Sequence, residues 1–301
     1  YPMGELAAHA VGSVRRLTKE DLRTVEPVQY SGSQFIGKRG VEAFYEKSLH
    51  GKVGYQKVET DAYGRVRRVL EVQGAQTGQN LTLHLDSRLQ VASVAALGDR
   101  RGAIVALDPR TGGVLAMVSQ PSYDPNLFVT GMSISTFDDL ASSIYLPLFN
   151  RAVNGQYAPG STFKPVVGLA GISSGVTQWS ETIEDKGWFR LPGQERVYRD
   201  WSWTKDDSGG QGEDDLNRAI YRSSNVYFYD LASRMEIGSV LEFASQFGLG
   251  RNVAVDIPEA STGLLPTPEW KRKAKNQPWY PGDSVNLGIG QGDLLATPMQ
   301  M

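Results

Sequence analysis

The order in which strand and helix patterns follow one another is the feature that most constrains the fold of this chain. Up to about residue 119, alternating apolar residues and turn residues dominate, which is typical of strands joined by hairpins. From about Ser133 onward, apolar residues recur at helical spacing between loops rich in glycine and proline. Strands followed by helices predict an α+β fold, with a helical subdomain against an antiparallel sheet. We expect the C-terminal strands of that sheet to be missing from this stretch of sequence.

Local signals between residues 55 and 120 predict two hairpins, a strand and a helix. Residues 102–119 hold two apolar runs on either side of an Asp-Pro-Arg-Thr-Gly-Gly turn, which predicts a hairpin. A second alternating pair lies within residues 55–72. Residues 81–85 alternate leucine with polar residues and are predicted to form a strand, Asp86 to cap a helix, and residues 87–97 to form that helix.

A segment with the composition of a linker divides the chain. Residues 74–79 are small and polar, as expected between two folded parts. A length of 301 residues suggests about two domains at ~150 residues each. We therefore predict that residues 1–79 form part of one domain and that residues 80–301 form the first part of another.

The composition excludes several classes of protein. Lysine and arginine number 31 and aspartate and glutamate 33, so the net charge of −2 argues against a nucleic-acid-binding protein. The chain has no cysteine, which excludes disulfides, thiolate metal sites and a cysteine nucleophile. No stretch approaches the ~20 apolar residues of a membrane helix. Neither end has the character of a natural terminus, so we expect the chain to be the middle of a longer protein.

The tetrapeptide STFK at residues 161–164 is the first candidate for catalysis. It places Ser161 and Lys164 one helical turn apart, after a Pro-Gly loop. A lysine whose pKa is lowered by burial can accept the proton of a serine hydroxyl, and a helix N-terminus favours a developing anion. On the tetrapeptide alone, the more common explanation is a helix-capping serine beside an exposed lysine. Ser202 and Lys205 have the same spacing.

The second candidate is the tripeptide Ser223-Ser224-Asn225, within a predicted helical run over residues 216–235. Its hydroxyl can relay a proton and its amide can hold a peptide carbonyl. The alternative is a polar junction between helices, since serine and asparagine are common caps. Residues 284–286 share the pattern. A lysine followed by Thr or Ser and then Gly, the third motif that such a site needs, is absent, so we expect this stretch alone to lack part of the site.

Other polar features predict solvated surface. The acidic, glycine-rich residues 206–215 lack the spacing of a calcium loop. The basic run at residues 271–275 is predicted to be a helix face in contact with water. All three histidines fall in the first 90 residues, so a Ser-His-Asp site and a helical histidine pair for zinc are both poorly supported.

Several longer stretches, in a fixed order along the chain, carry a resemblance to a known family. They are GKRGVE at 37–42, LHG at 49–51, LHLDSRLQ at 83–90, GAIVALDPRTGGVLAMVS at 102–119, NR at 150–151, YAPGSTFKP at 157–165, FGLG at 247–250, GIGQG at 288–292 and TP at 297–298. With these stretches the chain resembles the class B penicillin-binding proteins, which are serine D,D-transpeptidases of bacterial cell-wall synthesis. Within that family it is similar to members that act in cell elongation and rod-shape maintenance. The resemblance implies a penicillin-binding, serine β-lactamase-like transpeptidase domain preceded by a pedestal segment.

The resemblance implies a role for each matching residue. Ser161 would be the acylated nucleophile, its backbone N–H an oxyanion donor, and Lys164 its general base. Ser223 would pass a proton to the leaving D-alanine, and Asn225 would bind an amide of the substrate peptide. The family reaction cleaves a D-Ala–D-Ala bond and transfers the acyl group to an amine of a neighbouring stem peptide. Penicillins trap the acyl-enzyme.

Some relatives carry a metal site between the first two motifs, with Asp, His and Cys ligands. Asp185 and Asp200 are present in this chain, but residues 165–225 contain neither histidine nor cysteine. Gln211 and Ser224 are poor zinc ligands. We therefore predict no structural zinc and no cofactor.

The resemblance also implies partners and a location. The ligands would be peptidoglycan stem peptides and β-lactam antibiotics, with no nucleic acid. Residues 1–79 would be a non-catalytic pedestal that binds a SEDS-family glycosyltransferase and other proteins of the elongation complex. A membrane anchor, N-terminal to this stretch, would hold the protein at the periplasmic face of the bacterial inner membrane.

Two other functions fit the same motifs. A serine β-lactamase or D,D-carboxypeptidase, in which water deacylates the serine, usually lacks a pedestal. A non-catalytic penicillin-binding-like scaffold or β-lactam sensor would be acylated without turnover on stem peptides.

Overall fold

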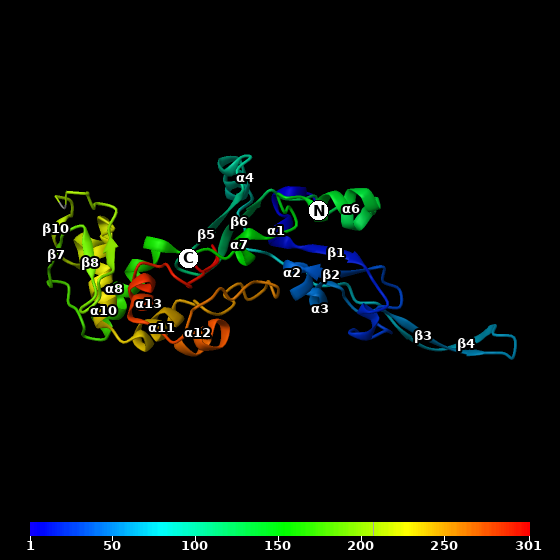
Figure 1. The fold of residues 1–301 in the computed structure, drawn as a ribbon. Helices are drawn as coiled ribbons and strands as arrows, with labels where there is room; N and C mark the ends of the chain where they lie inside the picture. Colours follow the sequence, from blue (N-terminus) through cyan, green and yellow to red (C-terminus); the bar gives the residue numbers. More distant parts are fainter. Residues whose placement is uncertain (207) are drawn as a thin grey trace. The chain divides into compact units, whose positions relative to one another are not determined.

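The computed structural model describes residues 1–206 and 208–301, which form two compact units (Figure 1). The first unit comprises residues 1–152 and 254–260, and the second comprises residues 153–253 and 261–301. In the described residues, all strands pair antiparallel in two-stranded sheets, and helices occur in both units. This arrangement confirms the predicted α+β class.

The first unit contains the hairpins and mostly short helices. Its strands pair as β1 with β2, β3 with β4 and β5 with β6. In chain order its elements are η1 (Gly4–Leu6), α1 (Ala8–Val11), β1 (Ser13–Arg16), η2 (Asp21–Arg23), β2 (Phe35–Arg39), α2 (Gly40–Phe44), α3 (Glu46–Leu49), β3 (Tyr55–Thr60), β4 (Val66–Gln73), α4 (Ser87–Leu97), β5 (Gly102–Leu107), β6 (Val114–Gln120), α5 (Leu127–Thr130) and α6 (Ile134–Ser142); α7 (Arg151–Asn154) begins at its end.

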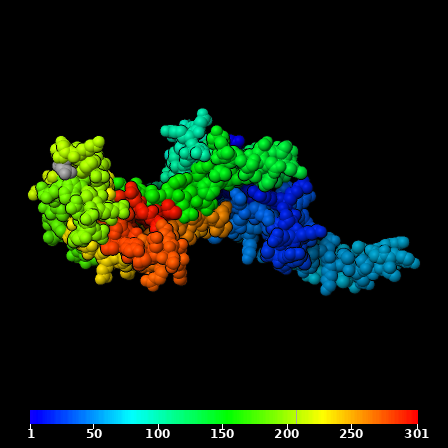
Figure 2. Space-filling model, in the orientation of Figure 1, coloured from blue at the N-terminus to red at the C-terminus, as the bar shows by residue number. Residues whose placement is uncertain are grey.

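Both predicted hairpins are confirmed, and they differ in burial. In the β5–β6 hairpin the middle of β6 is buried at Ala116, Met117 and Val118. The β3–β4 hairpin has almost no buried side chain, and it stands clear of the rest of its unit as a narrow ribbon (Figure 2). A two-stranded ribbon without a buried face gains little from packing. Hydrogen bonds and cross-strand pairs therefore hold β3–β4 together.

Helix α4 begins and ends where the sequence predicts, but the prediction of a strand directly before it is wrong. The Asp86 side chain accepts hydrogen bonds from the N–H groups of Arg88 and Leu89, as an N-cap does. Residues 81–85 form no strand. The outer edge of β6 is already occupied, because the Asp86 N–H donates to Leu115 and the buried Gln90 amide bonds both N–H and C=O of Met117. Residues 81–85 therefore find no free ladder along β6 and do not become a strand there.

The second unit is mainly helical. Its strands pair as β7 with β10 and β8 with β9, and its helices pack on a shared core. In chain order its elements are η3 (Gly160–Phe163), α8 (Lys164–Ser173), β7 (Ile183–Asp185), β8 (Trp188–Arg190), β9 (Val197–Arg199), β10 (Gly212–Asp214), α9 (Leu216–Tyr221), α10 (Asn225–Arg234), α11 (Ile237–Gln246), α12 (Pro268–Lys275) and α13 (Pro281–Gly288).

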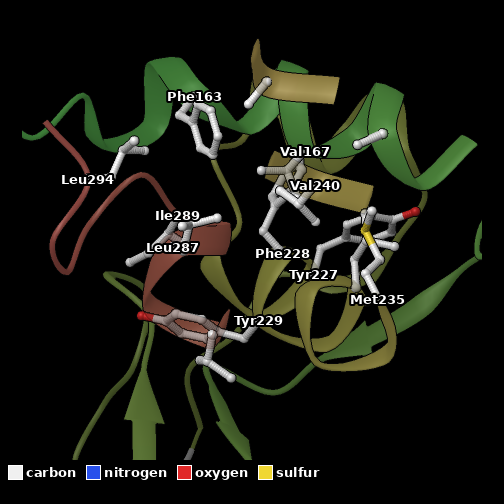
Figure 3. Packing of buried hydrophobic residues seen from close by; sticks show 14 of the residues in the cluster. Phe163, Val167, Tyr227, Phe228, Tyr229, Met235, Val240, Leu287, Ile289 and Leu294 are labelled. Carbon is white, nitrogen blue, oxygen red and sulfur yellow. The ribbon is translucent and has the colours of Figure 1, made fainter. Parts of the chain in front are cut away.

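Helix α10 is the centre of this core. Figure 3 shows the α10 side chains Tyr227, Phe228 and Tyr229 in this core. They lie between α8, which contributes Val167, and the chain segment made of α13 and the residues that follow it. A Cβ at Gly288 would lie 2.5 Å from the Cβ of Ala232 and 2.8 Å from the Phe228 carbonyl oxygen. Only glycine permits α13 to approach α10 this closely. The core therefore fixes the N-termini of α8 and α10 within one packed body.

The helical run predicted over residues 216–235 is two helices, which corrects the prediction. Ser223 adopts a left-handed conformation with φ +58°, which ends α9. The Ser223 and Ser224 N–H groups donate to Ile220 and Ala219, a C-terminal pattern known as a Schellman motif. The Ser224 hydroxyl then accepts from the Tyr227 N–H and caps α10. The tripeptide 223–225 is thus a junction and not a mid-helix segment.

The two charged segments predicted as solvated are each partly buried. Within residues 206–215, Asp207 lies outside the described residues; Gly212–Asp214 form strand β10, and Asp214 is fully buried. In the basic run, Lys271 is buried and forms an ion pair with Asp283. Burial of a charge requires a partner of this kind. The other lysines and the arginine of α12 face solvent as predicted.

Candidate functional site

The turn that carries Ser161 is anchored to the C-terminal segment of the second unit. Ser161 lies in η3, a 3-10 turn that leads directly into α8. The Gly160 N–H donates to the Gly290 carbonyl at 2.8 Å, and Tyr157 and Ala296 exchange two backbone hydrogen bonds of 2.9 Å. The serine is therefore presented by a turn that segments distant in sequence hold in place.

Lys164 is the first residue of α8, and only 1% of its surface is exposed. Its Nζ donates to the Ser223 carbonyl at 2.7 Å, to Ser223 Oγ at 3.2 Å and to Asn225 Oδ1 at 2.7 Å. Burial lowers the pKa of Lys164 to about 8, although the carboxylates of Asp200 and Asp185 act in the opposite direction. A lysine in this state is neutral in a fraction on the order of a tenth of molecules at neutral pH.

Ser223 links the lysine to Ser161. Its Oγ donates to the Ser161 Oγ at 2.9 Å, while the same oxygen accepts from Lys164 Nζ. No direct hydrogen bond joins Lys164 to Ser161 in the described residues, so the three groups form a row with Ser223 in the middle. The left-handed backbone at Ser223 costs about 1 kcal/mol for a residue other than glycine. Strain at such a position is typical of functional sites.

The capping interpretation of Ser161 is wrong in this structure. Neither η3 nor α8 has a side-chain cap, and Lys164 is buried, not exposed. Ser161 is itself exposed, so its hydroxyl is accessible. Ser161 is the second residue of the turn. Its backbone N–H lies before the first N–H that bonds within the helix, so it is available to an anion.

The second copies of each short motif lie elsewhere. Lys205 is exposed, and the Ser202 hydroxyl donates to Asp200. Ser284 accepts a hydrogen bond from the Trp279 indole within its own helical region. The structure thus brings together Ser161, Lys164, Ser223 and Asn225 and leaves the other matches outside. The three histidines belong to the first unit.

Sequence reasoning missed the carboxylates as part of this site. The Asp200 side chain accepts a hydrogen bond of 3.0 Å from the Asn225 N–H, and the Asp185 side chain accepts one of 2.6 Å from the Ser224 hydroxyl. From the sequence, the two aspartates suggest only metal ligands. No spacing rule connects residues 185 and 200 with a helix junction further along the chain, so no local signal was available.

These aspartates do not present a zinc site. In the described residues, no group of three or more His, Cys, Asp or Glu side chains could hold a metal ion. The Gln211 amide donates its own proton to Asp200 at 3.1 Å, and the Ser224 hydroxyl donates to Asp185. Zinc is bound through lone pairs of nitrogen, sulfur or carboxylate oxygen. Gln211 and Ser224 instead direct hydrogen-bond donors at the two carboxylates.

A substitution at Gly290 tests how the Ser161 turn is held. Gly290 has φ +69°, and a Cβ there would lie 2.1 Å from the Gly160 carbonyl oxygen. We expect Gly290→Ala to lower the free energy of unfolding by roughly 3 kcal/mol, as left-handed strain and overpacking add. Gly175→Ala is the matched control, because Gly175 has φ +72° and nothing within 4 Å of a Cβ. We expect about 1 kcal/mol there in urea denaturation. Equal losses would contradict the anchoring role.

Comparison with known proteins places this geometry in context. The model of the penicillin binding protein transpeptidase domain matches residues 102–301, and that of the penicillin-binding protein dimerisation domain matches residues 1–83. A peptidoglycan D,D-transpeptidase MrdA of Acinetobacter baumannii is 44% identical over 301 residues, which are 100% of this chain and 44% of the relative. The chain spans about half the length of the curated relatives it matches.

Two solved structures share the fold closely. Pseudomonas aeruginosa PBP2 in complex with WCK 5153 has a TM-score of 0.90 and 47% identity, over 100% of this chain and 61% of that one. PBP2 of Helicobacter pylori, solved in complex with MreC, has a TM-score of 0.90 and 36% identity, over 100% of this chain and 54% of that one. The division of the chain at residue 79 and the roles of individual site residues stay predictions.

Proposed function

The chain belongs to the family of penicillin-binding protein transpeptidase domains, and from this premise we propose that it is part of a peptidoglycan D,D-transpeptidase of cell elongation. One observation carries the proposal, namely the hydrogen-bonded row of Ser161, Ser223 and Lys164. An exposed hydroxyl, a relay hydroxyl and a buried amine of lowered pKa are the parts that a serine acyl-transfer enzyme needs.

We propose that the acylation step runs along this row. The Ser161 Oγ attacks the carbonyl carbon of the D-Ala–D-Ala bond, and its proton passes through the Ser223 hydroxyl to neutral Lys164. The Ser161 N–H stabilises the resulting oxyanion. When the C–N bond breaks, the proton returns through Ser223 to the nitrogen of the departing D-alanine. A serine ester then remains on the enzyme.

The second step restores the serine. The amine of a neighbouring stem peptide attacks the ester carbonyl and gives up a proton by the same route, and Ser161 recovers its hydrogen. Asn225 would hold the substrate peptide through its side-chain amide. Its Oδ1 is already bonded to Lys164, which fixes the direction of that amide. In a β-lactam the broken amide stays tethered to the acyl group, so the serine ester persists.

The wider assembly is also a proposal. We infer that residues 1–79 form part of the pedestal and residues 80–301 the first part of the transpeptidase domain. The pedestal would bind a SEDS-family glycosyltransferase and proteins of the elongation complex; a complex of the H. pylori relative with MreC supports such partners. We place the protein at the periplasmic face of the inner membrane. Among the described residues, no helix combines the length and the apolar character that a bilayer crossing requires.

The test uses the full-length natural protein that contains this sequence. It is incubated with benzylpenicillin, and its intact mass is measured before digestion and peptide mapping. We expect one stable adduct, located in the peptide that carries residues 161–164. Turnover of stem peptides with an acceptor amine then separates a transpeptidase from a carboxypeptidase or β-lactamase, which releases hydrolysed product, and from a scaffold or sensor, which releases none. Absence of an adduct would overturn the proposal.

A further inference from the structure

Two buried carboxylates lie behind the junction that carries Ser223 and Asn225. Asp185 ends strand β7 and is 2% exposed, and Asp200 follows strand β9 and is 5% exposed. A buried carboxylate is costly unless hydrogen bonds satisfy its oxygens. Here each of them has donors within the second unit, and neither forms an ion pair within 4 Å in the described residues.

Each carboxylate holds a different residue of the junction. Asp185 Oδ2 accepts from the Ser224 hydroxyl at 2.6 Å, and Ser224 is fully buried. Asp200 Oδ1 accepts from the Asn225 backbone N–H at 3.0 Å, one of the otherwise unpaired N–H groups of the first turn of α10. Hydrogen bonds to an ionised acceptor are about twice as strong as neutral ones. The two bonds therefore restrain consecutive residues directly after Ser223.

Gln211 joins the two carboxylates into one cluster. Its side-chain amide donates to Asp200 Oδ2 at 3.1 Å, and its backbone N–H donates to the Asp185 carbonyl at 3.0 Å. The other oxygen of Asp185 accepts from the Gly187 N–H at 2.7 Å. Every carboxylate oxygen of the pair thus has at least one hydrogen-bond donor from the protein. In the described residues, hydrogen bonds from the protein therefore satisfy both carboxylates without a cation.

We propose that Asp185, Asp200, Gln211 and Ser224 form a metal-free clamp that positions Ser223 and Asn225 against Lys164. The inference rests on the proposed function and names positioning residues for its acylation step. Some relatives are expected to hold this region with a metal, and the donor set in this chain does not fit one. Hydrogen bonds from Gln211 and Ser224 hold the two carboxylates instead of a metal. The clamp sets the Ser223 carbonyl, Ser223 Oγ and Asn225 Oδ1 at the distances that Lys164 requires.

Among the described residues, the carboxylates that raise the pKa of Lys164 against the effect of burial are Asp200 and Asp185, and both belong to the clamp. The neutral groups that face Lys164 are Ser223, Asn225 and the ring of Phe228, 5.6 Å from Nζ. Burial lowers the pKa of Lys164, and the two carboxylates raise it. Removal of one carboxylate charge therefore lowers the pKa of Lys164 further. The pH dependence of acylation therefore reports on the clamp in a way that general stability does not.

The test compares Asp200→Ala with Asp200→Asn in the full-length protein. We expect Asp200→Ala to slow acylation by benzylpenicillin 10- to 100-fold, since a small misplacement of positioned groups has such effects. Asparagine keeps an acceptor for the Asn225 N–H, so Asp200→Asn should recover most of the rate. The acylation rate of Asp200→Asn should rise at lower pH than that of the wild type, because protonated Lys164 loses the Asp200 carboxylate that stabilises it. Asp214→Asn is the control, a buried carboxylate bonded to neither Ser224 nor Asn225.

The outcomes separate the two proposals. Wild-type protein that forms no adduct overturns the proposed function and the clamp with it. Wild-type protein that acylates while Asp200→Ala keeps the same rate and the same pH profile overturns the clamp alone. A pH shift of equal size in Asp214→Asn would assign the effect to general burial and also reject the clamp. Stoichiometric zinc in the purified protein, or loss of acylation on treatment with a chelator, would overturn its metal-free character.

Discussion

Replacement of Ser161 by alanine is expected to abolish the benzylpenicillin adduct while the fold is retained. The Ser161 side chain is exposed, and among the described residues its hydroxyl bonds Ser223 alone, so little structure depends on it. Its loss removes the only oxygen that the proposed mechanism can esterify. The measurement is intact mass after treatment, with a thermal melting curve of the same sample. We expect the adduct to fall below detection and the melting temperature to change by only a few degrees.

Thr162→Val is the matched control for this experiment. Thr162 carries the neighbouring hydroxyl of the same turn. It is exposed, and in the part of the chain that the structure describes its hydroxyl bonds only the Pro159 carbonyl. Its variant should be acylated at the wild-type rate. An adduct that persists in Ser161→Ala would remove Ser161 from its proposed role, and an adduct lost in both variants would point to damage of the turn.

Replacement of Lys164 by methionine is expected to slow acylation by a factor of about 10² to 10⁴, the usual contribution of a general base. The rate in the wild type should rise with pH through about 8, because Lys164 must lose its proton before it can accept that of Ser161. This rise should be missing from Lys164→Met. Lys164→Arg should be equally slow, since a guanidinium stays protonated throughout this range. Stopped-flow measurements of acylation from pH 6 to about 10 record both effects.

Lys205→Met provides the control for the lysine variants. Lys205 occupies the same place in the second Ser-x-x-Lys match, yet it is exposed, and no hydrogen bond in the described part of the chain joins it to the row. Its variant should keep both the rate and the pH profile. A Lys164→Arg variant as fast as the wild type would mean that positive charge, and not proton acceptance, is what the site requires from this position.

The parts of the fold that follow short-range rules could be predicted from the sequence. Asp86 caps α4 because a carboxylate meets the free N–H groups of the next two residues, and the 102–120 hairpin follows from its turn. Residues 81–85 were mispredicted because a strand also needs a free edge, and the Gln90 side chain occupies it. The break at Ser223 escaped prediction because apolar spacing continues across it while the backbone turns left-handed.

The site could be predicted in the same uneven way. The spacing of Ser161 and Lys164 alone suggested that they cooperate, but the structure interposes Ser223 between their functional groups. Ser223 and Asn225 were linked to them only by resemblance to a family, since nothing local connects residue 223 with residue 161. Asp185 and Asp200 join the site through tertiary contacts alone. Contacts of this kind leave no periodic trace in the sequence.

The bond from Gly160 to Gly290 has a consequence for the order of events during folding. The hydrogen bonds that complete the site join residues 59 and 62 positions apart, and the Gly160 contact reaches further still along the chain. Loops of that length close late, after local helices and turns have formed. Reactivity toward a β-lactam would then appear only once the second unit is complete. A labelled penicillin added during refolding, or during synthesis on the ribosome, would therefore label native molecules and leave every partly folded molecule unlabelled.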